Sequence, residues 1–260
     1  EVERGRRIAE RAAAGRRIEK LATVDDRIVY VGVSPRRFAA ALRGRTVEAV
    51  HRRGKHLWMQ LDVRPWPTFH FGMTGGFHVY ENAADRPRFW KVELTLEGGA
   101  RLAMTNARRL GRIRLLDAPP AEPPISELGF DPLHDLPTLA ELVEQVARRK
   151  TPVKALLLNQ GFAAGVGNWI ADEVLYQAKI APMRRADTLS REEVGRLRSK
   201  LRSVVRKAVD VDAEKSRFPR AWLFHRRWGR EKDARTPRDE PIVHETVGGR
   251  TTAWVPTVQK

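Results

Sequence analysis

Short segments in which hydrophobic and polar residues alternate dominate the first half of the chain. Alternation with a period of two is typical of β-strands that bury one face. We expect two short strands within 18–33 with a turn at Asp25 and Asp26, a hairpin with a basic turn over 46–63, and strands within 69–80, 91–96 and 101–116. Helical spacing occurs over 1–14 and 36–44, the second helix with Ser34 as cap, Pro35 at its first position and Gly44 as stop. This half predicts a β-sandwich flanked by helices.

The second half changes to a helical pattern. Helices are expected over 138–149, over 152–158, directly after Asn168, and over 190–211 with Leu197, Leu201 and Val204 as its buried stripe. The segment IVHETVGGRTTAWVP predicts a β-hairpin that turns at Gly248 and Gly249. Residues 118–124 (APPAEPP) are rich in proline and separate the two patterns. The predicted fold class is therefore α+β with two domains, a β-sandwich over 1–117, a linker over 118–130 and a helical domain with a hairpin over 131–260.

The charge balance narrows the choice of partner. The 260 residues include 49 Lys and Arg against 32 Asp and Glu, which gives a formal net charge of +17. Such an excess favours a polyanionic partner, and nucleic acid is a commoner one than a membrane surface. No apolar run approaches the ~18 residues of a membrane span, so no membrane partner is expected. Cysteine is absent and the seven histidines never fall at metal-ligand spacing, so we expect neither a metal nor another cofactor.

A glycine-rich turn lies between two apolar helical segments. It reads NQGFAAGVGN and contains Gly161, Gly165 and Gly167 before Asn168, the expected N-cap of the following helix. Unpaired N–H groups and the helix dipole make such a helix start a site for a phosphate. The alternative is a plain helix–turn–helix connection that needs glycine for its geometry. In a chain this basic we favour phosphate binding.

Three other stretches carry candidate chemistry, each with an ordinary alternative. Lys55 in RRGKHLW belongs to a basic turn, which is usually a solvated surface. Met73 in FHFGMTG sits at a glycine-rich tip, where an apolar side chain could wedge into a base stack or pack as a half-buried hairpin residue. The loop TNARRLG offers Arg108, Arg109 and Leu110, which alone would be routine surface.

The stretch QGFAAGVGNWIADEVLYQAKIAP resembles the helix–two-turn–helix of the formamidopyrimidine-DNA glycosylase and endonuclease VIII family. The likeness is closest to the plant and fungal branch, which lacks the zinc finger. The cysteine-free hairpin at about 239–258 resembles that branch's zincless finger, in which strand pairing and the packing of Trp254 must replace a metal. For this chain the resemblance implies phosphate binding by Lys154, by the turn amides at Gly167, by Asn168 and by Arg250.

The resemblance also implies roles in the first domain. Lys55 would bind the phosphate near the lesion and assist the chemistry, and His70 would contact a phosphate. Met73 would fill the gap left by a flipped nucleotide, while Arg109 would pair with the orphaned base and Leu110 would wedge beside it. The common family pattern has phenylalanine at the position of Leu110, so the preference for the opposite base is expected to differ.

The family's nucleophile is a mature N-terminal proline, followed by a glutamate that shuttles protons. An α-amine has a pKa near ~8, so a useful fraction is neutral and nucleophilic at neutral pH. The family begins P-E-L-P-E-V-E and this sequence begins Glu1-Val2-Glu3, so we expect about four further residues, both catalytic ones among them, before Glu1. Glu1 and Glu3 match acidic positions near the family's lesion pocket.

These features favour a base-excision-repair DNA glycosylase with AP lyase activity, acting as a monomer on double-stranded DNA that contains oxidised bases or abasic sites. A non-catalytic protein that binds damaged DNA on the same scaffold, and a general architectural DNA binder, remain as alternatives. The segment over 212–220 leaves little room for the loop that closes over 8-oxoguanine in bacterial members. We therefore expect excision of formamidopyrimidines and hydantoins, and only weak activity on 8-oxoguanine. The expected location is the cytoplasmic nucleoid in a bacterium or the nucleus in a eukaryote.

The arginine- and tryptophan-rich stretch between Arg217 and Arg230 (RFPRAWLFHRRWGR) also fits nucleic acid. Its tryptophans are more often core residues than stacking platforms.

Overall fold

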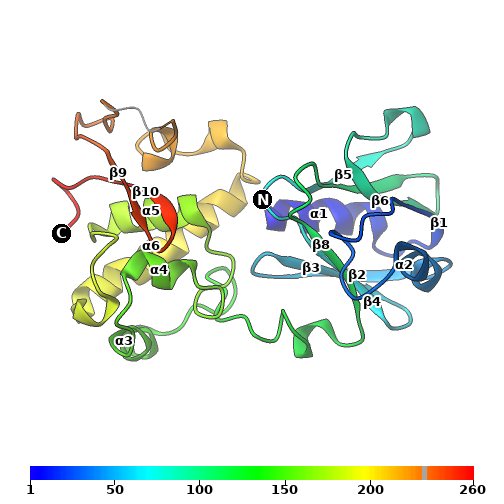
Figure 1. Cartoon of the computed structure of the whole chain (residues 1–260), viewed down its shortest axis with the longest axis horizontal. Helices are drawn as coiled ribbons and strands as arrows, with labels where there is room; N and C mark the ends of the chain where they lie inside the picture. The colour runs from blue at the N-terminus through cyan, green and yellow to red at the C-terminus, as the bar shows by residue number, and fades with distance from the viewer. Residues whose placement is uncertain (230–232) are drawn as a thin grey trace. The chain divides into compact units, whose positions relative to one another are not determined.

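The computed structural model describes residues 1–229 and 233–260, so Arg230 at the end of the arginine- and tryptophan-rich stretch lies outside the described residues. The chain forms two compact units, Glu1–Glu127 and Leu128–Lys260 (Figure 1). We call them the N-terminal and the C-terminal unit. The division between them falls within the proline-containing stretch over 118–130.

Two four-stranded antiparallel sheets build the N-terminal unit. The first has the order β1 (Ile18–Thr23), β6 (Trp90–Leu96), β7 (Arg101–Thr105), β5 (Gly76–Tyr80), and the second the order β2 (Val47–Arg53), β3 (His56–Leu61), β4 (Trp66–His70), β8 (Arg112–Leu116). Buried apolar side chains from both sheets form one core together with side chains of α1 (Val2–Ala13) and α2 (Pro35–Leu42). Two single 3₁₀ turns, η1 (Ala83–Asp85) and η2 (Pro119–Ala121), lie in the connections. The alternating pattern of the sequence thus becomes the two inner faces of a sandwich.

Helix α1 is the element that brings the start of the chain onto the sandwich. Its buried positions Ala9, Ala12 and Ala13 follow helical spacing. Gly5 lies so close to Phe71 that a Cβ atom there would come within 2.5 Å of the ring. Any larger residue at this position would push the first turns of α1 away from the β4–β5 loop.

The C-terminal unit is helical, with one two-stranded sheet. Its elements are α3 (Leu139–Ala147), α4 (Val153–Leu158), α5 (Asn168–Ala178), α6 (Arg191–Asp210), the hairpin β9 (Val243–Val247) and β10 (Arg250–Trp254), and the 3₁₀ turns η3 (Ala186–Thr188), η4 (Lys215–Arg217) and η5 (Leu223–His225). Capping boxes start α3 and α6, at Thr138 with Glu141 and at Ser190 with Glu193. The predicted stripe of α6 is buried in the core of this unit.

The structure corrects three local expectations. Residues 18–33 contain one strand rather than two, because Asp26 accepts the backbone N–H groups of Val29 and Tyr30 in a turn that replaces the second strand. Asn168 is the first residue of α5, and its N-cap is Gly167. Pro152 precedes α4 as its N-cap instead of lying within the first turn. The α+β class with two units is confirmed, as are the hairpin over 46–63 and the one that turns at Gly248 and Gly249.

No helix among the described residues has both the length and the apolar composition that a bilayer crossing requires. No group of three or more His, Cys, Asp or Glu side chains lies close enough together within 1–229 and 233–260 to hold a metal ion.

Candidate nucleic-acid interface

The turn between β2 and β3 presents Lys55 next to the start of α1. Arg52, at the end of β2, donates from Nε to the Glu3 carboxylate of α1 at 3.0 Å. Gly54 is buried and has φ of 57°, a conformation that glycine adopts without strain. The turn carrying Lys55 is therefore tied to the N-terminal end of α1.

Glu3 does not lie in an open pocket. Its carboxylate contacts Arg6 at 3.0 Å, Arg7 at 3.4 Å and Arg52 at 3.0 Å, and only 10% of the side chain is exposed. Three guanidinium groups bind this carboxylate, and the one from Arg52 links α1 to the β2–β3 turn, while the expected role near the lesion pocket stays a prediction. Glu1, expected at the same pocket, is exposed at the helix N-cap.

His70 ends β4 beside this turn. Its ring packs against that of His56, with 4.9 Å between centroids. Burial, together with the charges of Lys55, Arg114 and Arg112, lowers the pKa of His70 to about 4. The ring is therefore neutral at pH 7, and its Nδ1 accepts the backbone N–H of Gly72 at 3.2 Å. The proton consequently resides on Nε2, where it can be donated to a phosphate oxygen.

Met73 and Leu110 project from two neighbouring loops. Met73 is 67% exposed and Leu110 41% exposed, so two large apolar side chains on adjoining loops face solvent. The guanidinium Nη1 of Arg108 lies 3.6 Å from the Met73 sulfur. A Cβ atom on Gly72 would come within 2.7 Å of the Leu110 carbonyl carbon, so the loops touch through their backbones. Apolar tips and a guanidinium thus share one exposed surface.

Asn106 holds these two loops together, a role the sequence did not reveal. The residue is fully buried, and its amide donates to the Phe71 carbonyl at 2.7 Å while its Oδ1 accepts the Gly111 N–H at 2.9 Å. The signal that could have found it is an asparagine at the start of a loop that ends in glycine, since asparagine often bonds the backbone of turns.

Arg109 has a different environment from Arg108. Its Nε and Nη2 donate to the Asp26 carboxylate at 3.0–3.2 Å, and Lys91 binds the same carboxylate at 2.8 Å. Despite burial, the hydrogen bonds from Arg109 and Lys91 hold the pKa of Asp26 well below its usual range. The structure thus engages Arg109 at Asp26, whereas Arg108 lies beside Met73.

In the C-terminal unit, the α4–α5 turn and the tip of the β9–β10 hairpin lie together (Figure 1). Asn168 donates from Nδ2 to the Thr251 carbonyl at 2.8 Å. A Cβ atom on Gly248 would come within 2.8 Å of the Ala155 Cβ, so the hairpin tip rests on α4. Arg250, exposed at this tip, is therefore presented next to the start of α5.

Gln160 shapes the turn itself. Its amide donates to the carbonyls of Leu158 and Val166 at 2.9 and 3.0 Å, and its Oε1 accepts the Gly165 N–H at 3.1 Å. One side chain thereby spans the whole turn and orders the amides that precede α5.

Lys154, expected to bind a phosphate, lies inside the C-terminal unit, and its expected role stays a prediction. The side chain is fully buried, and Nζ lies 2.6 Å from Asp172 Oδ1 and 2.7 Å from Thr252 Oγ1. Asp172 also accepts Arg227 at 2.6 Å and the backbone N–H of Ala253 at 3.2 Å. This ion-pair cluster of Lys154, Asp172 and Arg227 fastens β10 to α4 and α5.

The arginine- and tryptophan-rich stretch is mostly core. Phe218 and Phe224 are buried, as is Trp222, and they pack around the ring of Trp169. Trp228 differs because it is 50% exposed, with the Arg227 guanidinium 4.5 Å from its ring centroid. The interpretation of tryptophans as core therefore holds for Trp222 and not for Trp228.

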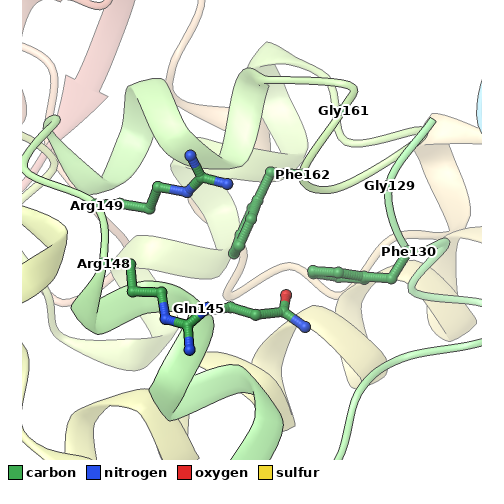
Figure 2. A pocket seen from close by; sticks show the side chains of 7 residues that line it. All are labelled: Gly129, Phe130, Gln145, Arg148, Arg149, Gly161 and Phe162. Carbon is green, nitrogen blue, oxygen red and sulfur yellow. The ribbon is translucent and has the colours of Figure 1, made fainter. Parts of the chain in front are cut away.

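A basic pocket adjoins the α4–α5 turn (Figure 2). Its volume is about 390 Å³, and its lining consists of Gly129, Phe130, Gln145, Arg148, Arg149, Gly161 and Phe162. The rings of Phe130 and Phe162 meet edge to face, with 5.2 Å between centroids. A lining with two arginines and no carboxylate favours an anion.

Comparisons with known proteins agree with this arrangement. The sequence model of the formamidopyrimidine-DNA glycosylase N-terminal domain matches residues 1–113, and that of the H2TH domain of the same enzymes matches residues 128–220. A formamidopyrimidine-DNA glycosylase of Arabidopsis thaliana is 40% identical over 274 residues, covering 100% of this chain and 70% of the relative. One of Symbiobacterium thermophilum is 38% identical over 213 residues, covering 81% of this chain and 69% of the relative.

The fold has solved counterparts. The crystal structure of Lactococcus lactis formamidopyrimidine-DNA glycosylase bound non-covalently to DNA with an AP site superposes with a TM-score of 0.87, at 23% identity, over 100% of this chain and 98% of that one. The complex of the same enzyme with DNA containing FAPY-dG gives a TM-score of 0.87 at 22% identity.

A sheet-based N-terminal unit followed by an H2TH unit is the architecture of one class of DNA glycosylases of base excision repair. Within that class, this chain belongs to the formamidopyrimidine-DNA glycosylase family.

Proposed function

We propose that this chain binds duplex DNA containing an oxidised base or an abasic site, removes the damaged base and cleaves the strand. The observation that carries the proposal is the surface of the N-terminal unit on which Lys55, neutral His70, Met73, Arg108 and Leu110 gather near the start of α1. The cations and the neutral N–H donor can bind DNA phosphates, while the apolar side chains can insert where a base has left the stack. The Lactococcus relatives bound to AP-site and FAPY-dG DNA support this partner.

The damaged nucleotide would leave the stack, which costs a few kcal/mol and least for a damaged pair. Met73 and Leu110 would fill the vacated space, and Arg108 would face the orphaned base. In the C-terminal unit, the Gly167 amide, Asn168 and Arg250 would bind phosphates through backbone N–H, amide and guanidinium groups.

Catalysis would use an N-terminal proline that we expect upstream of Glu1. Its neutral secondary amine would form a bond to C1′ while the bond from C1′ to the base breaks, and opening of the sugar would give an iminium, the protonated Schiff base. Loss of a C2′ proton from that iminium would then expel the 3′ phosphate, and a second elimination the 5′ phosphate. Lys55, close to the start of α1, would stabilise the phosphate near the reacting sugar. This chemistry requires no metal or other cofactor.

Formamidopyrimidines and hydantoins are the proposed substrates, with 8-oxoguanine removed weakly. Support comes from the short connection after α6, where Asp212 and Ala213 turn with φ of 51° and 54° and Phe218 is already buried in the core. Little chain is left there for a loop that covers a base. Comparable excision rates on 8-oxoguanine and formamidopyrimidine duplexes would contradict this ranking.

The decisive experiment is borohydride trapping on a duplex with one abasic site, using the protein expressed from its own gene with its native N-terminus. We expect a covalent protein–DNA adduct, because borohydride reduces the Schiff base. Binding that prefers the abasic duplex without adduct formation would favour the non-catalytic alternative. Binding without lesion preference would favour a general DNA binder.

We also propose that the protein acts as a monomer, which sedimentation of the complex with DNA would test. A DNA-repair function would place it in the nucleoid of a bacterium or the nucleus of a eukaryote.

A further inference from the structure

Phe89 is an exposed aromatic residue in a conformation that its side chain disfavours. It lies between η1 and β6 with 55% of its surface exposed, and its φ is 60°. A bulky side chain in this left-handed region is an outlier that persists only where the surrounding structure enforces it. Phe69, Phe71 and Phe77 are buried in the core of the N-terminal unit, whereas Phe89 is not part of that core.

Asn106 holds the backbone of Phe89 in place. The Phe89 carbonyl accepts the backbone N–H of Asn106 at 2.9 Å. The side chain of the same asparagine ties the loops that carry Met73, Arg108 and Leu110. Phe89 is thus fastened beside the surface on which the proposed void-filling residues lie.

Arg88 adds a charge to this aromatic face. Its Cζ lies 5.2 Å from the centroid of the Phe89 ring, a cation–π distance. The nearby Arg86 is instead committed to the buried Glu93, at 2.7 and 3.0 Å, and to the Trp90 ring. Arg88 and Phe89 together offer a flat apolar surface next to an exposed guanidinium, the combination that suits a nucleotide.

We propose that Phe89 and Arg88 form an additional DNA contact, on the undamaged strand beside the orphaned base. The ring would pack on a base or deoxyribose, and the guanidinium would bind the adjoining phosphate. We assign the contact to the undamaged strand because Asn106 bonds both to Phe89 and within the loop that is proposed to meet the orphaned base. This inference rests on the proposed function of the site.

The test uses Phe89→Ala, Phe89→Trp and Arg88→Gln in the full chain, with binding measured on a duplex that contains a tetrahydrofuran abasic analogue. Phe89→Ala should bind about tenfold more weakly, the size expected for one stacked nucleotide, and Phe89→Trp should retain the affinity. Arg88→Gln should reduce the slope of log Kd against log salt by about one. The matched control is Val63→Ala, since Val63 is 46% exposed in the β3–β4 connection, and it should leave Kd unchanged.

A second duplex tests the strand. When the undamaged strand lacks the nucleotides flanking the orphaned base, wild type and Phe89→Ala should bind equally. A difference that persists on this gapped duplex overturns the strand assignment, and an affinity of Phe89→Ala equal to that of wild type on the intact duplex overturns the contact itself. If wild type does not prefer the tetrahydrofuran duplex to undamaged DNA, the proposed function fails, and the contact fails with it.

Discussion

Arg108 and Arg109 are adjacent and identical in type, but their side chains have different partners. Arg108 and Arg109 are equivalent in the sequence, yet Arg109 is bound to Asp26 at 3.0 Å and Arg108 lies beside Met73. The difference arises because the positive φ of Arg109, 54°, points successive side chains in different directions. No pattern in TNARRLG reveals the buried carboxylate 83 residues earlier.

The first prediction separates these arginines. Arg108→Ala should lower the discrimination between bases opposite the lesion by tenfold or more, because the guanidinium beside Met73 is lost. Arg109→Ala should keep the discrimination and cost about 1 kcal/mol of stability, since its half-exposed ion pair with Asp26 is weak. Excision rates on duplexes with each of the four opposite bases measure the first effect, and urea unfolding measures the second. The reverse outcome would return the orphaned base to Arg109.

The second prediction concerns pH. Burial is the main cause that lowers the pKa of both His56 and His70 to about 4. Between about 4 and 6.5 the unfolded chain therefore binds more protons at these positions than the folded one. Stability of the N-terminal unit should be complete above pH 6.5 and fall as the pH drops towards 4, by a few kcal/mol for the pair.

Ring-proton NMR titration of the two histidines checks this directly. The midpoints should lie near pH 4, and Lys55→Ala should raise that of His70 while leaving it below 6.5, because burial remains. A midpoint near 6.5 would contradict the neutral ring proposed as a phosphate donor. The C-terminal unit contains an opposing group, since burial raises the pKa of Glu173 to about 7, so NMR is preferable to global unfolding.

At the scale of elements, periodicity predicted most of the structure. The hairpin over 46–63, the stripe of α6 and the turn at Gly248 and Gly249 follow from local patterns that the fold retains. The prediction of a second strand within 18–33 was wrong because Asp26 forms a turn there. The carboxylate of Asp26 is bound by Lys91 and Arg109, which lie far along the chain. The burial of Lys154 was not predicted for the same reason, since its partner Asp172 belongs to another helix.

The third prediction tests how the finger hairpin is held. Strand pairing and the packing of Trp254 were expected to replace a metal; β10 does pair with β9, and the cluster of Lys154, Asp172 and Arg227 fastens it as well. Asp172→Asn would leave two buried cations without their carboxylate, which typically costs about 3–5 kcal/mol. We expect that loss in urea unfolding, together with faster hydrogen exchange in β9 and β10.

The surface pair of Glu144 with Arg148, in which both side chains are exposed, offers the matched control. Glu144→Gln should change stability little, because solvent already screens this exposed pair. If both variants unfold alike, or if the hairpin of Asp172→Asn exchanges as slowly as in the wild type, the buried cluster does not hold the hairpin.

For the whole molecule, composition predicted the class of partner and the two-unit organisation, since a charge of +17 and the change from alternating to helical pattern are global properties. Composition could not tell which of the 49 basic residues face DNA. Lys55 and Lys154 both match family positions, yet one lies in an exterior turn and the other is fully buried. Burial depends on the packed structure, so only the fold separates them.

The fourth prediction turns that distinction into a measurement. Each charged phosphate ligand contributes about 0.9 to the slope of log Kd against log salt, through release of counterions from DNA. Lys55→Ala and Arg250→Ala should therefore each reduce the slope by about one. Asn168→Ala should weaken binding without changing the slope, because an amide displaces no counterion. Lys154→Met should also keep the slope, since its ammonium is already neutralised by Asp172 at 2.6 Å. A slope lowered by one in Lys154→Met would show that this lysine leaves Asp172 for a phosphate, and the role expected from the sequence would then be restored.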